Sequence, residues 1–233
     1  MYYIHEEYRT PDRDTVIWHY FSLSKFLSLL NDKKLYFNRS DLFYDTKEGE
    51  ISELDKNMLN SYSSDITYRI ENNGFGYYYV HCWVMYQEEL YLMWNTYSSL
   101  EEGVAIKTTI GDLIDSLNPN DPREIIISDV RYMDYENDYT FEKTGGIVNL
   151  LAPSFCKRRY FSQEKELRLV YHNHSMRLSE NDKGVLFDVN LNKLINEIWV
   201  APDATEWFYN LIDKEIKLHG ISKPVLNSNI RSK

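Results

Sequence analysis

The feature that most constrains the fold is the segment YYYVHCWVM at 77–85, which is almost continuously apolar. Aromatic and β-branched residues of this kind favour strands. A strand that is apolar on both faces has to be covered on both faces, as in the middle of a sheet. The segment therefore predicts a central, fully buried strand, preceded by a turn at Gly74 and Gly76.

Shorter segments on both sides predict the rest of the fold. Strands and helices interleave without a regular strand–helix–strand rhythm, which indicates an α+β fold with a single domain and a mixed sheet with inserted helices. We place the domain at 15–228, between a flexible N-terminal arm at 1–14 and a C-terminal tail at 229–233. Strands are predicted at 15–21, 34–38, 104–109, 124–132, 167–171, 184–189, 198–201 and 225–227, and helices at 22–31, 50–60, 88–97, 110–117, 147–155, 191–197 and 205–219.

Composition excludes several classes of protein. Hydrophobic residues make up 43% of the 233 residues, too many for a disordered chain. The chain has no apolar segment long enough to span a membrane, and its start lacks the pattern of a signal peptide. With only two cysteines, neither a disulfide framework nor a cysteine zinc site is expected, so we expect a cytoplasmic protein.

The charge balance limits the partners. The net charge of −10 argues against general binding to a nucleic-acid backbone, so a nucleic-acid partner would need a local basic groove. Glycine-rich phosphate loops and the G-x-S-x-G motif are absent, which excludes P-loop ATPases, Rossmann enzymes and serine hydrolases as first hypotheses. His172 and His174 are two residues apart, but spacing supplies no third ligand, so no metal site is predicted.

Charged residues are densest in KRRYFSQEKELRLV at 157–170. Alternate residues of a strand share a face, so Glu164, Glu166 and Arg168 are predicted to line up. Two neighbouring carboxylates repel, which raises the pKa of one of them, and the guanidinium of Arg168 would counter that. Such a row can act as a general base or stabilise a developing cation. The alternative is an ionic ladder on a solvated edge strand.

Two further places could bind an anionic ligand. Lys157, Arg158 and Arg159 are adjacent cations in an acidic chain, and they form either a phosphate-docking point or a solvated basic turn. Arg39 follows a predicted strand and could reach a phosphate, while Ser40 beside it is also a candidate helix cap. On the first predicted strand, His19 points away from the face of its two neighbours, as a core or edge histidine would.

These segments resemble a widespread bacterial family that is catalogued as a domain of unknown function, number two-nine-seven-one. The resemblance runs from about Thr15 to Ser228 and implies a shared fold, but the family name supplies no chemistry. It is carried by WHYFS, KLYFNRSDLFYDTKEGE, HCWV, ELYLMWNTYS, GVAIKTT, KRRYFSQEKELRLV and EIWVAPDATEWF. As motifs, these contain M-W-x-x-Y-S, G-V-A-I and K-R-x-x-F-x-x-E-x-E-x-R.

The chain also looks distantly similar to the ADP-ribosyltransferases. Its opening strand, helix and short second strand follow their order, and Glu164-Lys165-Glu166 has the E-x-E form of the arginine-type toxins. The likeness implies that NAD is the substrate. It also implies that Glu166 stabilises the cation formed as nicotinamide leaves, while Glu164 positions or deprotonates the acceptor. By the same likeness, the residues that contact NAD are His19, Tyr20, Arg39 and Ser40, and those that bind the acceptor are Lys157, Arg158, Arg159 and Arg168.

The leading hypothesis is therefore an NAD-dependent mono-ADP-ribosyltransferase, a toxin or phage-defence effector that modifies a nucleic acid or a protein. An antitoxin or chaperone would be its partner. One alternative is a non-catalytic protein-interaction module, because tyrosine is enriched at interfaces and the chain has 20 tyrosines. Another is a metal-dependent nuclease that uses the carboxylates at 41–50 together with Glu164 and Glu166, with Lys165 beside them.

Overall fold

The computed structural model describes residues 1–4, 8, 10–43, 45, 47–62, 65, 68, 77–141, 149–174 and 182–230. The apolar segment forms β3 (Tyr77–Val84) inside a nine-stranded sheet, as predicted. β8 (Glu166–Asn173) pairs with the whole of β3 in antiparallel fashion, and β5 (Ile126–Asp129) pairs with the other edge of β8. The glycine turn predicted before the segment lies outside the described residues.

Two strands share the second edge of β3. β1 (Val16–Ser22) meets it at the pair Trp18–Val84, and β2 (Lys34–Arg39) meets it further along the strand. Two histidine rings fill the region where β1 and β2 separate. His19 Nδ1 lies 2.7 Å from the carbonyl oxygen of Cys82, and His81 Nδ1 lies 2.9 Å from that of Tyr36. Contacts from the two histidine side chains to backbone carbonyl oxygens therefore replace part of the backbone hydrogen bonding where β1 and β2 separate.

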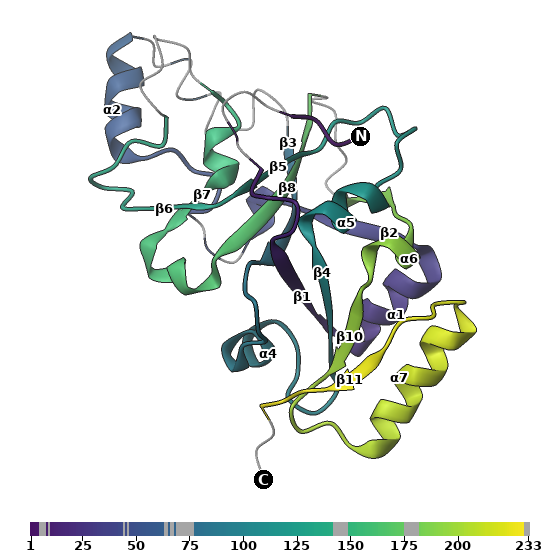
Figure 1. Ribbon diagram of the computed structural model, residues 1–233. Coiled ribbons are helices and arrows are strands. Elements are labelled where there is room, and N and C mark those ends of the chain that lie inside the picture. Colours follow the sequence, from purple (N-terminus) through teal and green to yellow (C-terminus); the bar gives the residue numbers. More distant parts are fainter. Residues whose placement is uncertain are drawn as a thin grey trace.

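The sheet continues beyond β1 and β2 (Figure 1). β4 (Gly103–Thr109) pairs with β1, and β10 (Glu197–Val200) and the parallel strand β11 (Val225–Asn227) follow. At the opposite end, β9 (Gly184–Asp188) pairs with β2. β6 (Arg131–Met133) and β7 (Cys156–Arg158) form a separate parallel pair. The predicted mixed sheet is confirmed.

Helices join these strands, which confirms the α+β class. In Figure 1, α2 (Glu53–Tyr62) lies beside β6 and β7, far from the helices next to β10 and β11. The other helices of the described residues are α1 (Leu23–Asp32), α4 (Tyr91–Tyr97), α5 (Ile110–Ser116), α6 (Leu191–Leu194) and α7 (Glu206–Leu218), and the 3-10 turns there are η1 (Ser40–Leu42), η2 (Ala152–Phe155) and η3 (Arg159–Glu164). Among the described residues, no helix is long and apolar enough to cross a membrane.

Alternation along β3 and β8 separates two faces with different chemistry. Side chains of the apolar face enter the main core, which also contains Ile17 and Phe21 of β1. We define this apolar face as Tyr79, His81, Trp83, Leu167 and Leu169. The opposite face carries charged groups, and we define this ionic face as Val80, Cys82, Val84, Glu166, Arg168 and Val170.

Two predicted elements differ from the structure. The helix expected at 147–155 is wrong: its last four residues form the 3-10 turn η2, and Pro153 cannot donate a backbone hydrogen bond there. Residues 147–148 lie outside the described part of the chain. The strand expected at 124–132 is divided between two sheets, as β5 and β6.

The first residues contact the domain through the backbone. The Tyr3 amide donates to the carbonyl oxygen of Ile125, 2.9 Å away, and Tyr2 and Ile125 form an isolated parallel bridge. The boundaries of the arm and of the tail stay predictions.

Candidate functional site

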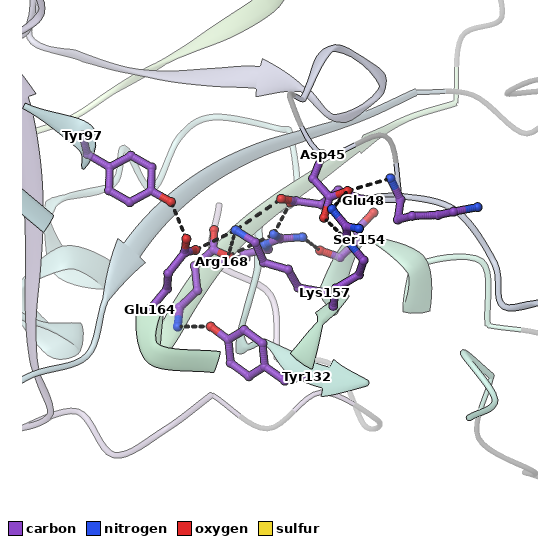
Figure 2. Close-up of polar contacts among 11 residues, drawn as sticks. Asp45, Glu48, Tyr97, Tyr132, Ser154, Lys157, Glu164 and Arg168 are labelled. Atoms are coloured by element: carbon purple, nitrogen blue, oxygen red, sulfur yellow. Dashed lines mark hydrogen bonds and ion pairs between the residues drawn. The ribbon is translucent and has the colours of Figure 1, made fainter. Parts of the chain in front are cut away.

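Charged side chains of the ionic face meet charged side chains from neighbouring elements (Figure 2). We call Glu48, Lys157, Glu164, Glu166 and Arg168 the ion cluster. Lys157 Nζ lies 2.6 Å from Glu164 Oε2, 3.2 Å from Glu48 Oε1 and 3.3 Å from Glu166 Oε2. Arg168 Nη2 lies 3.0 Å from Glu166 Oε2 and also pairs with Glu48. The cluster joins β7, η3, β8 and the segment after η1.

All five side chains are nearly excluded from water. Their exposed fractions run from 1% for Arg168 to 11% for Glu164. Three carboxylates face two cations, so the formal charge of the cluster is −1. Charges out of water interact more strongly than charges at a surface. The cluster therefore holds one unit of uncompensated negative charge in a buried place.

The two cations keep Glu166 ionised. Burial alone would raise the pKa of its carboxyl group, but the charges of Arg168 and Lys157 outweigh burial and lower it to about 2. For Lys157, burial disfavours the ammonium, and the charges of Glu166 and Glu48 outweigh that cost, so its pKa is raised. Glu166 is therefore a carboxylate throughout the neutral pH range.

Local backbone geometry explains how the two glutamates meet. Glu166 and Arg168 share a face of β8, as predicted, and their contact confirms that Arg168 compensates the carboxylate. The prediction that Glu164 belongs to the same strand face is wrong, because Glu164 ends η3. Lys165 between them has a left-handed backbone, with φ of 41°. This turn interrupts the strand and directs Glu164 toward Lys157 by another route.

Two tyrosine hydroxyls contact the cluster from other elements. Tyr97 of α4 donates to Glu164 Oε1 at 2.7 Å, and Tyr132 of β6 accepts from the Glu166 amide at 2.8 Å. Burial raises the pKa of both phenols, so both keep their protons. Sequence reasoning did not place these tyrosines in the site, and it included Glu48 only in the nuclease hypothesis, which grouped the carboxylates at 41–50 with Glu164 and Glu166. The available signal was that Tyr97 and Glu48 stand in segments that carry the family resemblance.

The three adjacent cations do not form one basic turn. Lys157 and Arg158 belong to β7, and Arg159 begins η3. Each contacts a different acidic partner: Lys157 contacts the cluster, Arg158 contacts both carboxylate oxygens of Asp45 at 2.9 Å, and Arg159 contacts Asp134. All three are therefore already compensated by carboxylates.

The residues expected to contact NAD lie on different faces of the sheet and in different elements of the fold. Trp18 and Val84 are paired, so Tyr20 shares the face of Glu166, while His19 lies on the other face with Phe21. The Tyr20 hydroxyl accepts from the Leu90 amide at 3.2 Å.

Arg39 ends β2 and Ser40 follows it, and their contacts in the described part of the chain lie outside the ion cluster. Arg39 Nε donates to Asp41 Oδ1 at 2.7 Å, and its guanidinium lies 5.0 Å from the centre of the Tyr77 ring. Ser40 begins η1. The structure thus brings together Lys157, Glu164, Glu166 and Arg168, and it leaves His19, Arg39 and Ser40 outside the ion cluster.

Metal ligation has no support in the part of the chain that the structure describes. There, no group of three or more His, Cys, Asp or Glu side chains could hold a metal ion. The carboxylates of the nuclease hypothesis do meet, since Glu48 joins Glu164 and Glu166, but their shared cation is Lys157. The rings of His172 and His174 lie 4.0 Å apart and His172 stacks on Tyr78.

Comparisons with known proteins give little further information. No protein-family model and no curated protein matches the chain.

Three solved structures of DarT from Thermus sp. 2.9 resemble it weakly. The complex with carba-NAD+ has a TM-score of 0.43 at 12% identity and covers 94% of this chain and 97% of that one. The complex with ADP-ribosylated single-stranded DNA has a TM-score of 0.43 at 13% identity, covering 96% and 98%. The complex with NAD+ has a TM-score of 0.41 at 11% identity, covering 95% and 98%. Overlap at these TM-scores is too low to support an inference.

Proposed function

We propose that the chain is an NAD-dependent mono-ADP-ribosyltransferase whose catalytic centre is the ion cluster. One observation carries the proposal: five buried charged side chains leave an excess of one negative charge. A buried excess of this kind favours a cationic ligand or a cationic transition state. The reacting half of NAD fits, because its nicotinamide ring carries a positive charge.

The chemistry of the transfer uses a fixed anion at one place. The bond between nicotinamide and C1′ of the ribose breaks, nicotinamide leaves as a neutral molecule, and positive charge moves onto the ribose. A carboxylate held beside that ribose stabilises the charge as it develops. Glu166 suits this role because two cations keep it ionised and in place.

Glu164 suits a different step. Its carboxylate has one cation partner, Lys157, and its other oxygen accepts a hydrogen bond from the hydroxyl of Tyr97. Tyr97 as a whole residue is 44% exposed, so this side of the cluster borders on solvent. We assign Glu164 to the acceptor, whose hydroxyl or amine proton it takes as the new bond to C1′ forms.

Other assignments follow as parts of the same proposal. Tyr20 shares the face of Glu166 and is the first candidate for an NAD contact. His19, Arg39 and Ser40 are further candidates, ranked below it. Arg158 and Arg159 can receive acceptor phosphates if they exchange their present carboxylate partners. The acceptor class, the role as a toxin or phage-defence effector, the antitoxin or chaperone partner and the cytoplasmic location stay predictions.

The deciding experiment compares NAD binding and nicotinamide release in the wild type, in Glu166→Gln and in Glu89→Gln. Glu89 is a matched control, because it is also a buried glutamate, bonded to Trp94 outside the cluster. We expect nicotinamide release to fall by about 100- to 1,000-fold in Glu166→Gln, the effect typical of losing one electrostatic catalytic group. The Glu89 variant should keep the wild-type rate.

A simpler probe tests the charge argument without catalysis. The cation 1-methylnicotinamide should bind more tightly than neutral nicotinamide, and Glu166→Gln should remove that preference. If the folded wild type neither binds nor cleaves NAD at millimolar concentration, the proposal is rejected. The interaction module would then be favoured, since Tyr91, Leu92 and Tyr160 are exposed apolar side chains near or on α4 and η3.

A further inference from the structure

Lys157 has an unusual position for a lysine. Its side chain is 7% exposed, and its ammonium group has three N–H donors. Three carboxylates, each from a different glutamate, lie within 3.3 Å of it. The ring of Phe161 lies 5.0 Å from the ammonium and covers a further side. The donors of Lys157 are therefore matched to three acidic partners.

The second cation of the cluster makes a different set of contacts. Arg168 reaches Glu166 and Glu48, and its Nη1 donates to the carbonyl oxygen of Ser154 at 2.8 Å. Among the described side chains, Lys157 is the one that contacts all three carboxylates, and it is the cation that contacts Glu164. The relative placement of Glu164 and Glu166 thus depends on Lys157 rather than on Arg168.

The backbone between the two glutamates cannot fix this placement alone. Glu164 ends a 3-10 turn and Glu166 begins a strand, with the left-handed residue Lys165 between them. Their side chains leave the chain in different local conformations, yet both carboxylates reach the same nitrogen atom. A shared cation is what holds two like charges together at this distance.

We propose that Lys157 is a positioning residue, whose ammonium fixes the distance and orientation between Glu164 and Glu166 for the transfer reaction. The inference rests on the function proposed above. It assigns Lys157 to the organisation of the carboxylates, in place of the phosphate contact that its sequence context suggested. The other groups facing Glu166 are Arg168, Glu48, the thiol of Cys82 on β3 and the hydroxyl of Tyr132 on β6.

The test uses Lys157→Met, Lys157→Arg and the control Lys165→Gln, with NAD as substrate and nicotinamide release as readout. Lys165 is an exposed cation of the same segment, and its amine lies 4.8 Å from the centre of the Tyr86 ring, away from the cluster. We expect kcat to fall about 100-fold in Lys157→Met, as for a misplaced catalytic group, with a smaller change in KM. Lys157→Arg keeps the charge, but its planar fork fits three separate carboxylates poorly, so kcat should fall in that variant too.

The pH profile separates positioning from a merely structural role. Without Lys157, the carboxyl group of Glu166 loses one of the two cations that lower its pKa, so the acid limb of kcat should move to higher pH in Lys157→Met. The control should keep both the wild-type kcat and the wild-type acid limb. If both Lys157 variants keep the wild-type kcat and acid limb, the proposal is overturned.

A second measurement does not depend on catalysis. Carboxyl carbon NMR titrations of Glu166 should show a raised pKa in the Lys157→Met protein and a smaller change in Lys157→Arg. If Lys157→Met does not fold, Lys157→Arg decides, and unchanged titration curves with unchanged kcat overturn the proposal. A wild type that does not cleave NAD rejects the proposed function, while the titrations still decide whether Lys157 lowers the pKa of Glu166.

Discussion

The two faces of β3 and β8 are formed by alternate residues of the same two strands. They differ in what they bury: one face buries hydrocarbon side chains, and the other buries charged side chains that need partners. The apolar face removes large hydrocarbon side chains from water, such as Trp83, Leu167 and Leu169, each no more than 1% exposed. That burial is favourable for each residue by itself. The ionic face buries Glu166 and Arg168, which is unfavourable unless each charge meets a partner.

The difference shows where a chain of this kind can carry chemistry. On the apolar face, the hydrocarbon side chains need no particular neighbour, so their packing tolerates exchange of similar side chains. On the ionic face, each charged group depends on named partners from other elements, such as Lys157 of β7. Replacing a buried ion network by apolar side chains is often neutral or stabilising, so stability alone does not explain this cluster.

The largest expected effect on stability comes from breaking the ionic face. Arg168→Met should lower the free energy of unfolding by about 3–5 kcal/mol at pH 7, because it leaves Glu48 and Glu166 buried with one cation fewer. Leu169→Ala, next in sequence on the apolar face, is the control and should cost about 2–5 kcal/mol through the cavity it leaves. Urea unfolding measures both.

The dependence on pH separates these two losses. At pH 3 the Glu166 carboxylate of Arg168→Met, which has lost one of the cations that lower its pKa, can take up a proton, so the cost of this substitution should shrink, while the cost of Leu169→Ala should stay the same. Equal costs at both pH values in Arg168→Met would show that packing, rather than charge, is what Arg168 supplies.

Lowering the pH should reduce the contribution of the ionic face to the free energy of unfolding, and it should do so within a defined pH range. The pKa of Glu166 is lowered from 4.5 to about 2 in the folded protein, so the folded state binds fewer protons than the unfolded state between those values. Its contribution of about 3 kcal/mol is present above pH 4.5 and is lost as the pH falls toward 2. Glu166→Gln should therefore show a shallower fall of unfolding free energy across this window, measured by urea titrations at a series of pH values.

The apolar face should respond to acid in an earlier window. His81 stacks on His19 with ring centres 4.6 Å apart, and burial lowers its pKa from 6.5 to about 4. Because the folded state keeps this ring neutral, stability should fall by about 3 kcal/mol as the pH drops from 6.5 to 4.

His81→Phe keeps an aromatic ring in place and should remove the part of that slope that His81 contributes, leaving the window of Glu166 unchanged. The remaining slope belongs to His19, whose pKa is lowered by burial and then by the charge of His81. If the unfolding free energy of His81→Phe fell with pH as steeply as that of the wild type, protonation of His81 would not be what destabilises this face.

The sequence predicted the apolar face better than the ionic one. The segment at 77–85 predicts a buried strand by local pattern alone, and the partner strand at 167–171 is confirmed with Leu167 and Leu169 inside. Hydrophobic alternation is a local property, so reading it needs no knowledge of distant residues. The shared face of Glu166 and Arg168 followed from the same rule.

The other residues of the site could not be predicted from local sequence patterns. Glu48 lies 109 positions before Lys157 in the printed sequence, and only the folded sheet brings them together. Glu164 was misplaced because strand alternation cannot anticipate the left-handed turn at Lys165, a residue type that rarely adopts it. The acidic partners of Arg158 and Arg159 were not predicted, since Asp45 and Asp134 reach them from other parts of the chain.

The smallest expected effect belongs to an ion pair at the surface, which completes the comparison of buried and exposed charge. Arg13 and Asp115 approach to 2.7 Å, but their side chains are 57% and 55% exposed. Arg13 also donates to the carbonyl oxygen of Gly111 at 3.3 Å, so a single substitution would mix two contacts. A double-mutant cycle with Arg13→Ala and Asp115→Ala isolates the pair, and its coupling energy should be below about 1 kcal/mol and shrink in high salt. The same cycle on Arg168 and Glu166 should give a larger coupling that salt hardly changes, because water and ions are excluded there. Equal couplings would mean that burial does not distinguish the ionic face from an ordinary surface pair.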